Sequence, residues 1–168
     1  AVQCSEYGNL LSVQSSRVAF VFDKSTGLVT SYKVKGTEYF HEGFGIQPNF
    51  WRAPNDNDYG SQMPKRLQIW KQSSKNFNVV DASLTMDGKD AVLKVSYLLA
   101  AGNLYIATYR IHPSGVVKAN YTFTSTEMEA AKTEASEATL MATFTPGNEA
   151  IRKESSKLVV PRIGVRFR

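Results

Sequence analysis

Residues 91–99, Ala-Val-Leu-Lys-Val-Ser-Tyr-Leu-Leu, decide the fold class of this chain. Side chains of an extended strand point alternately to its two faces. One face of this run is wholly apolar: Ala91, Leu93, Val95, Tyr97 and Leu99. Residues 116–124 repeat the pattern, with inward positions Val117, Ala119, Tyr121 and Phe123 and outward positions Lys118, Asn120, Thr122 and Thr124. Both runs predict strands with one face on a core and one face in water.

Turn signals connect these strands to their neighbours. Asp87-Gly88 predicts a hairpin after residues 76–86, Gly102-Asn103 leads into a strand over 104–112, and Pro113–Gly115 turns the chain again. Further towards the N-terminus, strands are predicted over 9–15, 17–23 and 28–35, with a short extension at 38–40. Together the N-terminal segments predict a β-meander at the start of the chain.

Two N-terminal strands carry more detailed predictions. Residues 17–23 are apolar on both sides, which predicts burial on both faces. Residues 28–35 alternate, and we expect one face to hold Leu28, Thr30, Tyr32 and Val34. The turn between them ends at Gly27, which can adopt a positive φ.

One helix interrupts the strand pattern, over residues 62–72. Met63, Leu67 and Trp70 fall on one helical face, Ser61 is the expected N-cap, and Pro64 is tolerated in the first turn. The pattern as a whole predicts an all-β sandwich of two sheets, a single domain over residues 1–168, with this helix at an edge.

Composition narrows the classes of function. The chain has 42% hydrophobic and 21% charged residues, which is typical of a globular domain. The net charge is +5, but the basic residues are not clustered together with aromatic residues, so nucleic-acid binding is disfavoured. No apolar run is long enough to cross a membrane. The single cysteine, Cys4, excludes an intrachain disulfide, and His41 and His112 lack metal-ligand spacing, so no metal or cofactor is expected.

The most distinctive segment is Pro48–Gly60, which combines polar turn formers with large aromatics. Its candidate site residues are Trp51, Arg52, Asn55, Asp56, Asn57 and Asp58. These side chains can bind sugar hydroxyls, but they can equally shape their own turns, with Arg52 bound to a carboxylate or to backbone carbonyls. If that pair is buried, removing Arg52 should be strongly destabilising. Two nearby acids, Asp56 and Asp58, also suggest glycosidase chemistry, although only weakly.

The string Asn49–Gly60, followed by Met63–Leu67 and Trp70-Lys71, resembles the small-chain domain of large bacterial β-galactosidases of glycoside hydrolase family 2. The stretch Phe22–Tyr32 and the element Pro161–Val165 share this resemblance, which runs over most of residues 9–124 and 158–168. The resemblance implies a partial galactose-mutarotase-like β-supersandwich. It also implies that the catalytic glutamates lie in a separate barrel domain, so that this chain holds no catalytic residue and is inactive alone. Cofactors such as Mg or Na would lie outside this segment.

The same resemblance sets the expected partners. These are other domains of the same polypeptide, with a galactoside substrate bound only by the full enzyme. The pattern over 158–168 ends inside a strand, which predicts a domain truncated at its C-terminal end and self-association of the fragment. Two alternatives stay open, a free-standing carbohydrate-binding module and an aldose-mutarotase-like protein. Residues 127–157 match neither the pattern nor the family, apart from a possible strand over 138–145.

Overall fold

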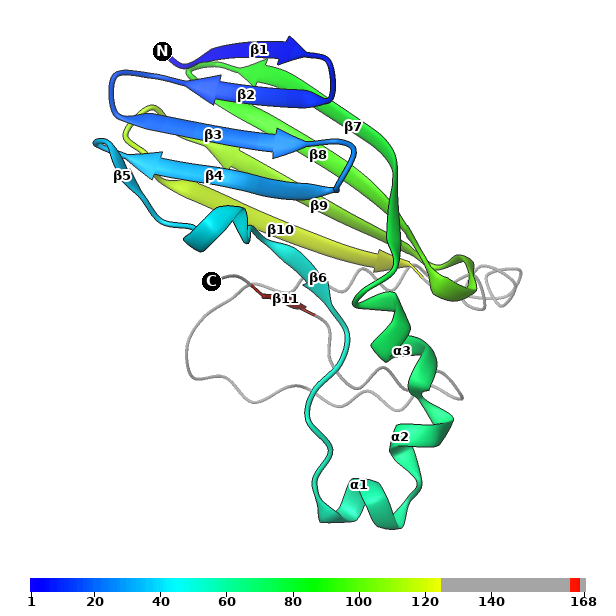
Figure 1. Cartoon of the computed structure of the whole chain (residues 1–168). Coiled ribbons are helices and arrows are strands. Elements are labelled where there is room, and N and C mark those ends of the chain that lie inside the picture. The colour runs from blue at the N-terminus through cyan, green and yellow to red at the C-terminus, as the bar shows by residue number, and fades with distance from the viewer. Residues whose placement is uncertain (125–163, 167–168) are drawn as a thin grey trace.

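The computed structural model describes residues 1–124 and 164–166, and its main body consists of two antiparallel sheets stacked face to face. Five strands form one sheet in the order β1-β2-β3-β4-β5, and four form the other in the order β10-β9-β8-β7. Figure 1 shows the first sheet lying across the second. The predicted all-β sandwich is therefore confirmed.

The first sheet is a continuous meander. Its strands are β1 (Gln3–Tyr7), β2 (Leu10–Gln14), β3 (Val18–Asp23), β4 (Leu28–Val34) and β5 (Thr37–Glu38). Strand β1 was not predicted, because its residues are polar and largely exposed at the sheet edge. Gly27, in the turn before β4, has a φ of 71°, as expected.

The second sheet contains residues 91–99, the run that decided the fold class, and this run forms a strand as predicted. Its strands are β7 (Phe77–Asp87), β8 (Asp90–Leu99), β9 (Leu104–Ile111) and β10 (Val117–Thr124), with a short 3-10 turn, η2 (Ala100–Gly102), before β9. All five predicted inward residues of β8 are buried. The four predicted inward residues of β10 are partly buried against the same core.

The core lies between the two sheets and is rich in aromatic rings. Tyr97, Tyr105 and Tyr109 of the second sheet are at most 1% exposed, and they face Phe20 and Phe22 of the first. The hydroxyl of Tyr97 donates to the carbonyl oxygen of Gly27 at 2.9 Å, and that of Tyr32 donates to the carbonyl of Gly115. These hydrogen bonds tie the two layers together through buried or half-buried donors.

A β-bulge changes which residues of β4 face the core. The register of β3 and β4 shifts between Val21 and Phe22, so that Phe22 lies opposite Val29 whereas Phe20 lies opposite Tyr32. Thr30 is the extra residue, and Val29, fully buried, takes the core position. The predicted single face of Leu28, Thr30, Tyr32 and Val34 is therefore wrong at its first half, because a bulge reverses the alternation.

Strand β3 is also buried on one face only. Val18, Phe20 and Phe22 are buried, whereas Ala19 and Val21 are half-exposed. The prediction of burial on both faces was wrong, because no described layer covers the outer side of this sheet.

The chain leaves the first sheet through η1 (His41–Gly43) and enters β6 (Gln47–Asn49), which pairs antiparallel with β11 (Gly164–Arg166). Between η1 and β6 the backbone at Gly45 passes very close to β4. A Cβ on Gly45 would lie 1.2 Å from the carbonyl oxygen of Val29, so only glycine fits this approach. Pairing of β11 confirms a strand within the predicted run 158–168, while the remainder of that run and all of 127–157 lie outside the described residues.

Three short helices follow β6: α1 (Asp56–Gly60), α2 (Met63–Arg66) and α3 (Gln68–Ser73). The single helix predicted over 62–72 is thus divided at Leu67, whose φ of −110° and ψ of 20° are not helical. Ser61 ends α1 and does not cap α2, which begins after Gln62 in a left-handed conformation. The apolar face was predicted correctly, since Met63 and Trp70 are buried and Leu67 is partly buried.

Candidate functional site

The distinctive segment of the sequence forms an arm that projects from the sandwich. We call residues 51–69 the arm, because Phe50 and Trp70, which bound it, are both buried. Figure 1 shows it extending away from the two sheets, with α1 at its far end. Within the arm, Met63 alone is buried, and most of the other residues are exposed.

The arm is anchored at its base by aromatic packing. The Phe50 ring lies 5.2 Å from that of Tyr105 in an edge-to-face arrangement and 6.1 Å from that of Trp70. Phe123 of β10 completes the cluster, at 5.6 Å from Trp70. The backbone is fixed by Ser74, whose hydroxyl accepts from the Phe50 N–H at 2.8 Å and donates to the Trp70 carbonyl at 2.9 Å.

The tip of the arm is ordered by hydrogen bonds among its own residues. Asn55 caps α1 by accepting from the Asp58 N–H at 3.0 Å, and the Asp58 carboxylate accepts from the Asn55 N–H at 2.9 Å, forming a capping box. Arg52 binds the same carboxylate through two nitrogens, at 2.5 and 2.8 Å. This bidentate pairing fixes the loop 52–58 against the start of the helix.

The electrostatics of Asp58 follow from these contacts. The hydrogen bond from Arg52, followed by that from the Asn55 backbone, lowers the pKa of the Asp58 carboxyl below its ordinary value. The carboxylate in turn raises the pKa of Arg52. A glycosidase general acid needs a raised pKa, so Asp58 is unsuited to donate a proton.

The predicted site residues therefore divide into two groups. Arg52, Asn55 and Asp58 bind one another, as the expectation of a carboxylate partner for Arg52 required. The side chains are not deeply buried, however: that of Arg52 is 41% exposed and that of Asp58 14%. The strong destabilisation expected from breaking a buried pair does not apply here. Trp51 packs partly against the core, while Asp56 and Asn57 are exposed.

One exposed residue at the tip of the arm was not among the predicted site residues. Tyr59 follows Asp58 directly and is 63% exposed. An aromatic residue held on a short, capped helix without burial is typical of a contact surface. The available signal was its position directly after the polar run 55–58, which favours exposure over a role in the core.

Other sequence candidates do not join this site. His41 is close to Glu42, at 3.6 Å, but their side chains are 72% and 83% exposed and form no enclosed acid–base pair. His112 lies in the β9–β10 turn and binds Ser114. Among residues 1–124 and 164–166 there is no group of three or more potential ligands that could hold a metal ion. In the same residues no helix is long and apolar enough to span a membrane.

Comparison with known proteins identifies the family. Residues 14–168 match the family described as "Beta galactosidase small chain". A β-galactosidase of Priestia megaterium is 32% identical over 110 residues, covering 64% of this chain, and one of Kluyveromyces lactis is 31% identical over 101 residues, covering 57%. A β-galactosidase small subunit of Latilactobacillus sakei is 27% identical over 77 residues, covering 46%.

These relatives are much longer than the matched region. The match covers 10% of the length of the first two proteins and 24% of the small subunit. The matched segment in each is thus a small part of a larger protein. With its antiparallel sandwich and its match over residues 14–168, this chain belongs to the β-galactosidase small-chain family.

Proposed function

We propose that this chain is a non-catalytic domain of a β-galactosidase, a glycoside hydrolase that removes terminal β-galactosyl groups. In this proposal it packs on the catalytic barrel of the same enzyme and helps to form the wall of the active-site cleft. The catalytic carboxylates are supplied by the barrel. The family match and the small share of its relatives that the chain spans support this assignment.

The arm is the observation that carries the proposal. An exposed segment normally loses order unless something holds it, because fixing a residue costs conformational entropy. This one is held by the capping box and by the bidentate Arg52–Asp58 contact, yet it leaves Tyr59, Asp56 and Asn57 exposed. Preorganisation without burial lowers the cost of binding a partner. We therefore assign the arm to the contact with the barrel.

A complementation assay tests this function. The 168-residue chain is mixed with a relative's β-galactosidase from which the matching region has been deleted, and turnover of a chromogenic galactoside is measured. We expect neither part alone to turn over the substrate, and activity to return when they are combined. Turnover by the chain alone that is lost in Asp56→Asn or Asp58→Asn would overturn the proposal.

Tyrosine variants then test the role of the arm. Tyr59→Ala should weaken complementation by roughly tenfold or more, since exposed aromatics at interface centres contribute about 2 kcal/mol or more. Tyr7→Ala is the matched control, because Tyr7 is 86% exposed but lies in β1, away from the arm. Equal loss in both variants would contradict docking through the arm.

A further inference from the structure

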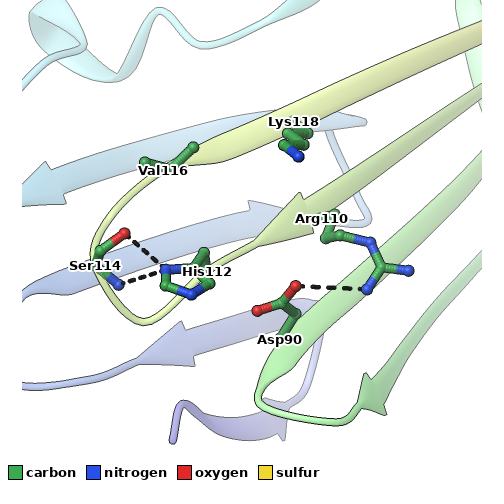
Figure 2. A pocket seen from close by; sticks show the side chains of 6 residues that line it. All are labelled: Asp90, Arg110, His112, Ser114, Val116 and Lys118. Atoms are coloured by element: carbon green, nitrogen blue, oxygen red, sulfur yellow. Dashed lines mark hydrogen bonds and ion pairs between the residues drawn. The ribbon is translucent and has the colours of Figure 1, made fainter.

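The sandwich carries two hollows of similar volume but different character. One, of about 270 Å³, is polar, and in it Arg110 binds Asp90 while His112 binds Ser114 (Figure 2). The other, of about 280 Å³, is apolar, and we call it the apolar hollow. Polar side chains that have partners can also face water, whereas apolar walls are costly to leave in contact with it. The apolar hollow is therefore the stronger sign of a further contact.

The apolar hollow lies between the two sheets, on the side where β5 and β10 are the edge strands. Its walls come from the first sheet, from the segment between β5 and β6, and from β10: Phe20 and Tyr32, Tyr39 and Ile46, and Val117 and Ala119. The ring of Tyr32 lies 6.2 Å from that of Phe20 and 5.6 Å from that of Tyr39. The hydroxyl of Tyr32 is already bound to the Gly115 carbonyl, so this residue presents its ring to the hollow. Such a lining suits an aromatic or aliphatic side chain.

The ladder between β6 and β11 leads to this hollow. Its pairs place Val165 opposite Pro48 and Arg166 opposite Gln47. Partners in an antiparallel ladder advance in opposite directions, so the next pair is Phe167 opposite Ile46. Phe167 itself lies outside the described residues, but Ile46 is one of the residues that line the apolar hollow. The register therefore brings an aromatic residue to the hollow.

The pleat of β6 determines which face this residue shares. Pro48 is buried, and Ile46, two positions earlier and hence on the same face, packs against the core. Residues directly opposite each other in an antiparallel pair have side chains on one face, with Cβ atoms about 4.5–5.5 Å apart. The position of Phe167 opposite Ile46 is thus on the core side of the ladder.

We propose that the side chain of Phe167 fills the apolar hollow and packs on Ile46 and Tyr39. The space is sufficient for one ring, because a cavity of roughly 150 Å³ already accommodates benzene. Phe50, which follows β6, is buried in the core, so β6 is anchored at both of its ends before the chain enters the arm. The proposal concerns the sandwich and does not rest on the proposed docking of the arm.

Nuclear Overhauser effects (NOEs) measured on the unaltered 168-residue chain test the proposal directly. We expect NOEs from the ring protons of Phe167 to the methyl groups of Ile46 and to the ring of Tyr39. A mixture of isotope-labelled and unlabelled chains separates contacts within one chain from contacts between two copies. Absence of these NOEs, or their appearance only between labelled and unlabelled chains, would overturn the proposal.

Variants test the contribution of the contact to stability. Phe167→Ala should lower the melting temperature by roughly 5 °C, because it removes a ring from an apolar site, whereas Phe167→Leu should retain most of the stability. Arg166→Ala is the matched control on β11, since Arg166 lies opposite Gln47 on the other face of the ladder, and should change the melting temperature little. Equal losses in Phe167→Ala and Arg166→Ala would contradict the proposal.

A double variant tests whether the two side chains meet. The combined loss in Phe167→Ala with Ile46→Ala should be smaller than the sum of the single losses, because side chains in contact are energetically coupled. Strictly additive losses would mean that Phe167 does not pack on Ile46. If Phe167→Ala fails to fold, the NOEs of the unaltered chain decide the question.

Discussion

The sandwich and the arm of this chain are stabilised in different ways. The sandwich is held by burial, with fully enclosed rings such as Tyr97, Tyr105 and Phe22 between two sheets. The arm is held by short-range hydrogen bonds at its surface and by aromatic anchoring only where it joins the sandwich. Burial is non-directional and cooperative, whereas each contact in the arm acts locally. The two regions should therefore respond differently to mutation.

Removing the aromatic anchor should have the largest effect, because Trp70 packs in the core at the point where the arm joins the sandwich. Trp70→Ala empties a site that is 2% exposed and should cost about 3–5 kcal/mol in the free energy of unfolding. Thermal unfolding should show a melting temperature lowered by about 10 °C. Ile69→Ala, one residue earlier and 39% exposed, is the control and should change it little. Equal effects of the two changes would mean that the anchor does not belong to the core.

A smaller global effect is expected from the hydrogen bond between the layers. Tyr97→Phe keeps the ring but leaves the Gly27 carbonyl without its buried donor, which should cost about 1–2 kcal/mol. Denaturant unfolding should show a lower midpoint with an unchanged slope. The exposed Tyr7 provides the control, since Tyr7→Phe should leave the midpoint unaltered.

The smallest global effect, and the clearest local one, is expected at Asp58. Its pKa is lowered in the folded arm, so the contact stabilises the arm at neutral pH and is lost as the pH falls through that lowered value. Asp58→Asn should leave the melting temperature nearly unchanged but increase proteolytic cleavage within residues 52–60. Acidification should increase cleavage of the original chain towards that of the variant.

Asp56→Asn is the control for that experiment, because Asp56 is exposed on the same short helix but does not bind Arg52. It should leave cleavage and its pH dependence unchanged. A fall in melting temperature for Asp58→Asn as large as that for Trp70→Ala would show that arm and sandwich unfold as one unit, contrary to the comparison above.

The sandwich was largely predictable from sequence, for a physical reason. Alternation in residues 91–99 and 116–124 is imposed by the core, and it correctly assigned the inward residues of β8 and β10. The reversal at Thr30 was not predictable, because a bulge depends on the register of two strands and alternation describes only one. Strand β1 gave no signal, since an exposed edge needs no apolar pattern.

The arm was less predictable, because its helices are short and depend on local capping. The expected cap Ser61 instead ends α1, a helix that the sequence analysis did not predict and that Asn55 begins by forming a capping box with Asp58. The sequence suggested that Arg52 would meet a carboxylate, but not that Asp58 would be shared by Arg52 and the helix start. Burial of that pair could not be inferred at all, since it depends on how far the arm projects.

The pairing of β6 with β11 has a consequence for folding kinetics. Residues 47–49 are joined by hydrogen bonds to residues 164–166, far along the chain, whereas neighbouring strands in both sheets are consecutive in sequence. Closing a long loop is entropically slower than forming adjacent hairpins. We therefore expect the two meanders to form early and the β6–β11 ladder to form late. During synthesis, β6, which leads into the arm, would remain unpaired until residues 164–166 had been made.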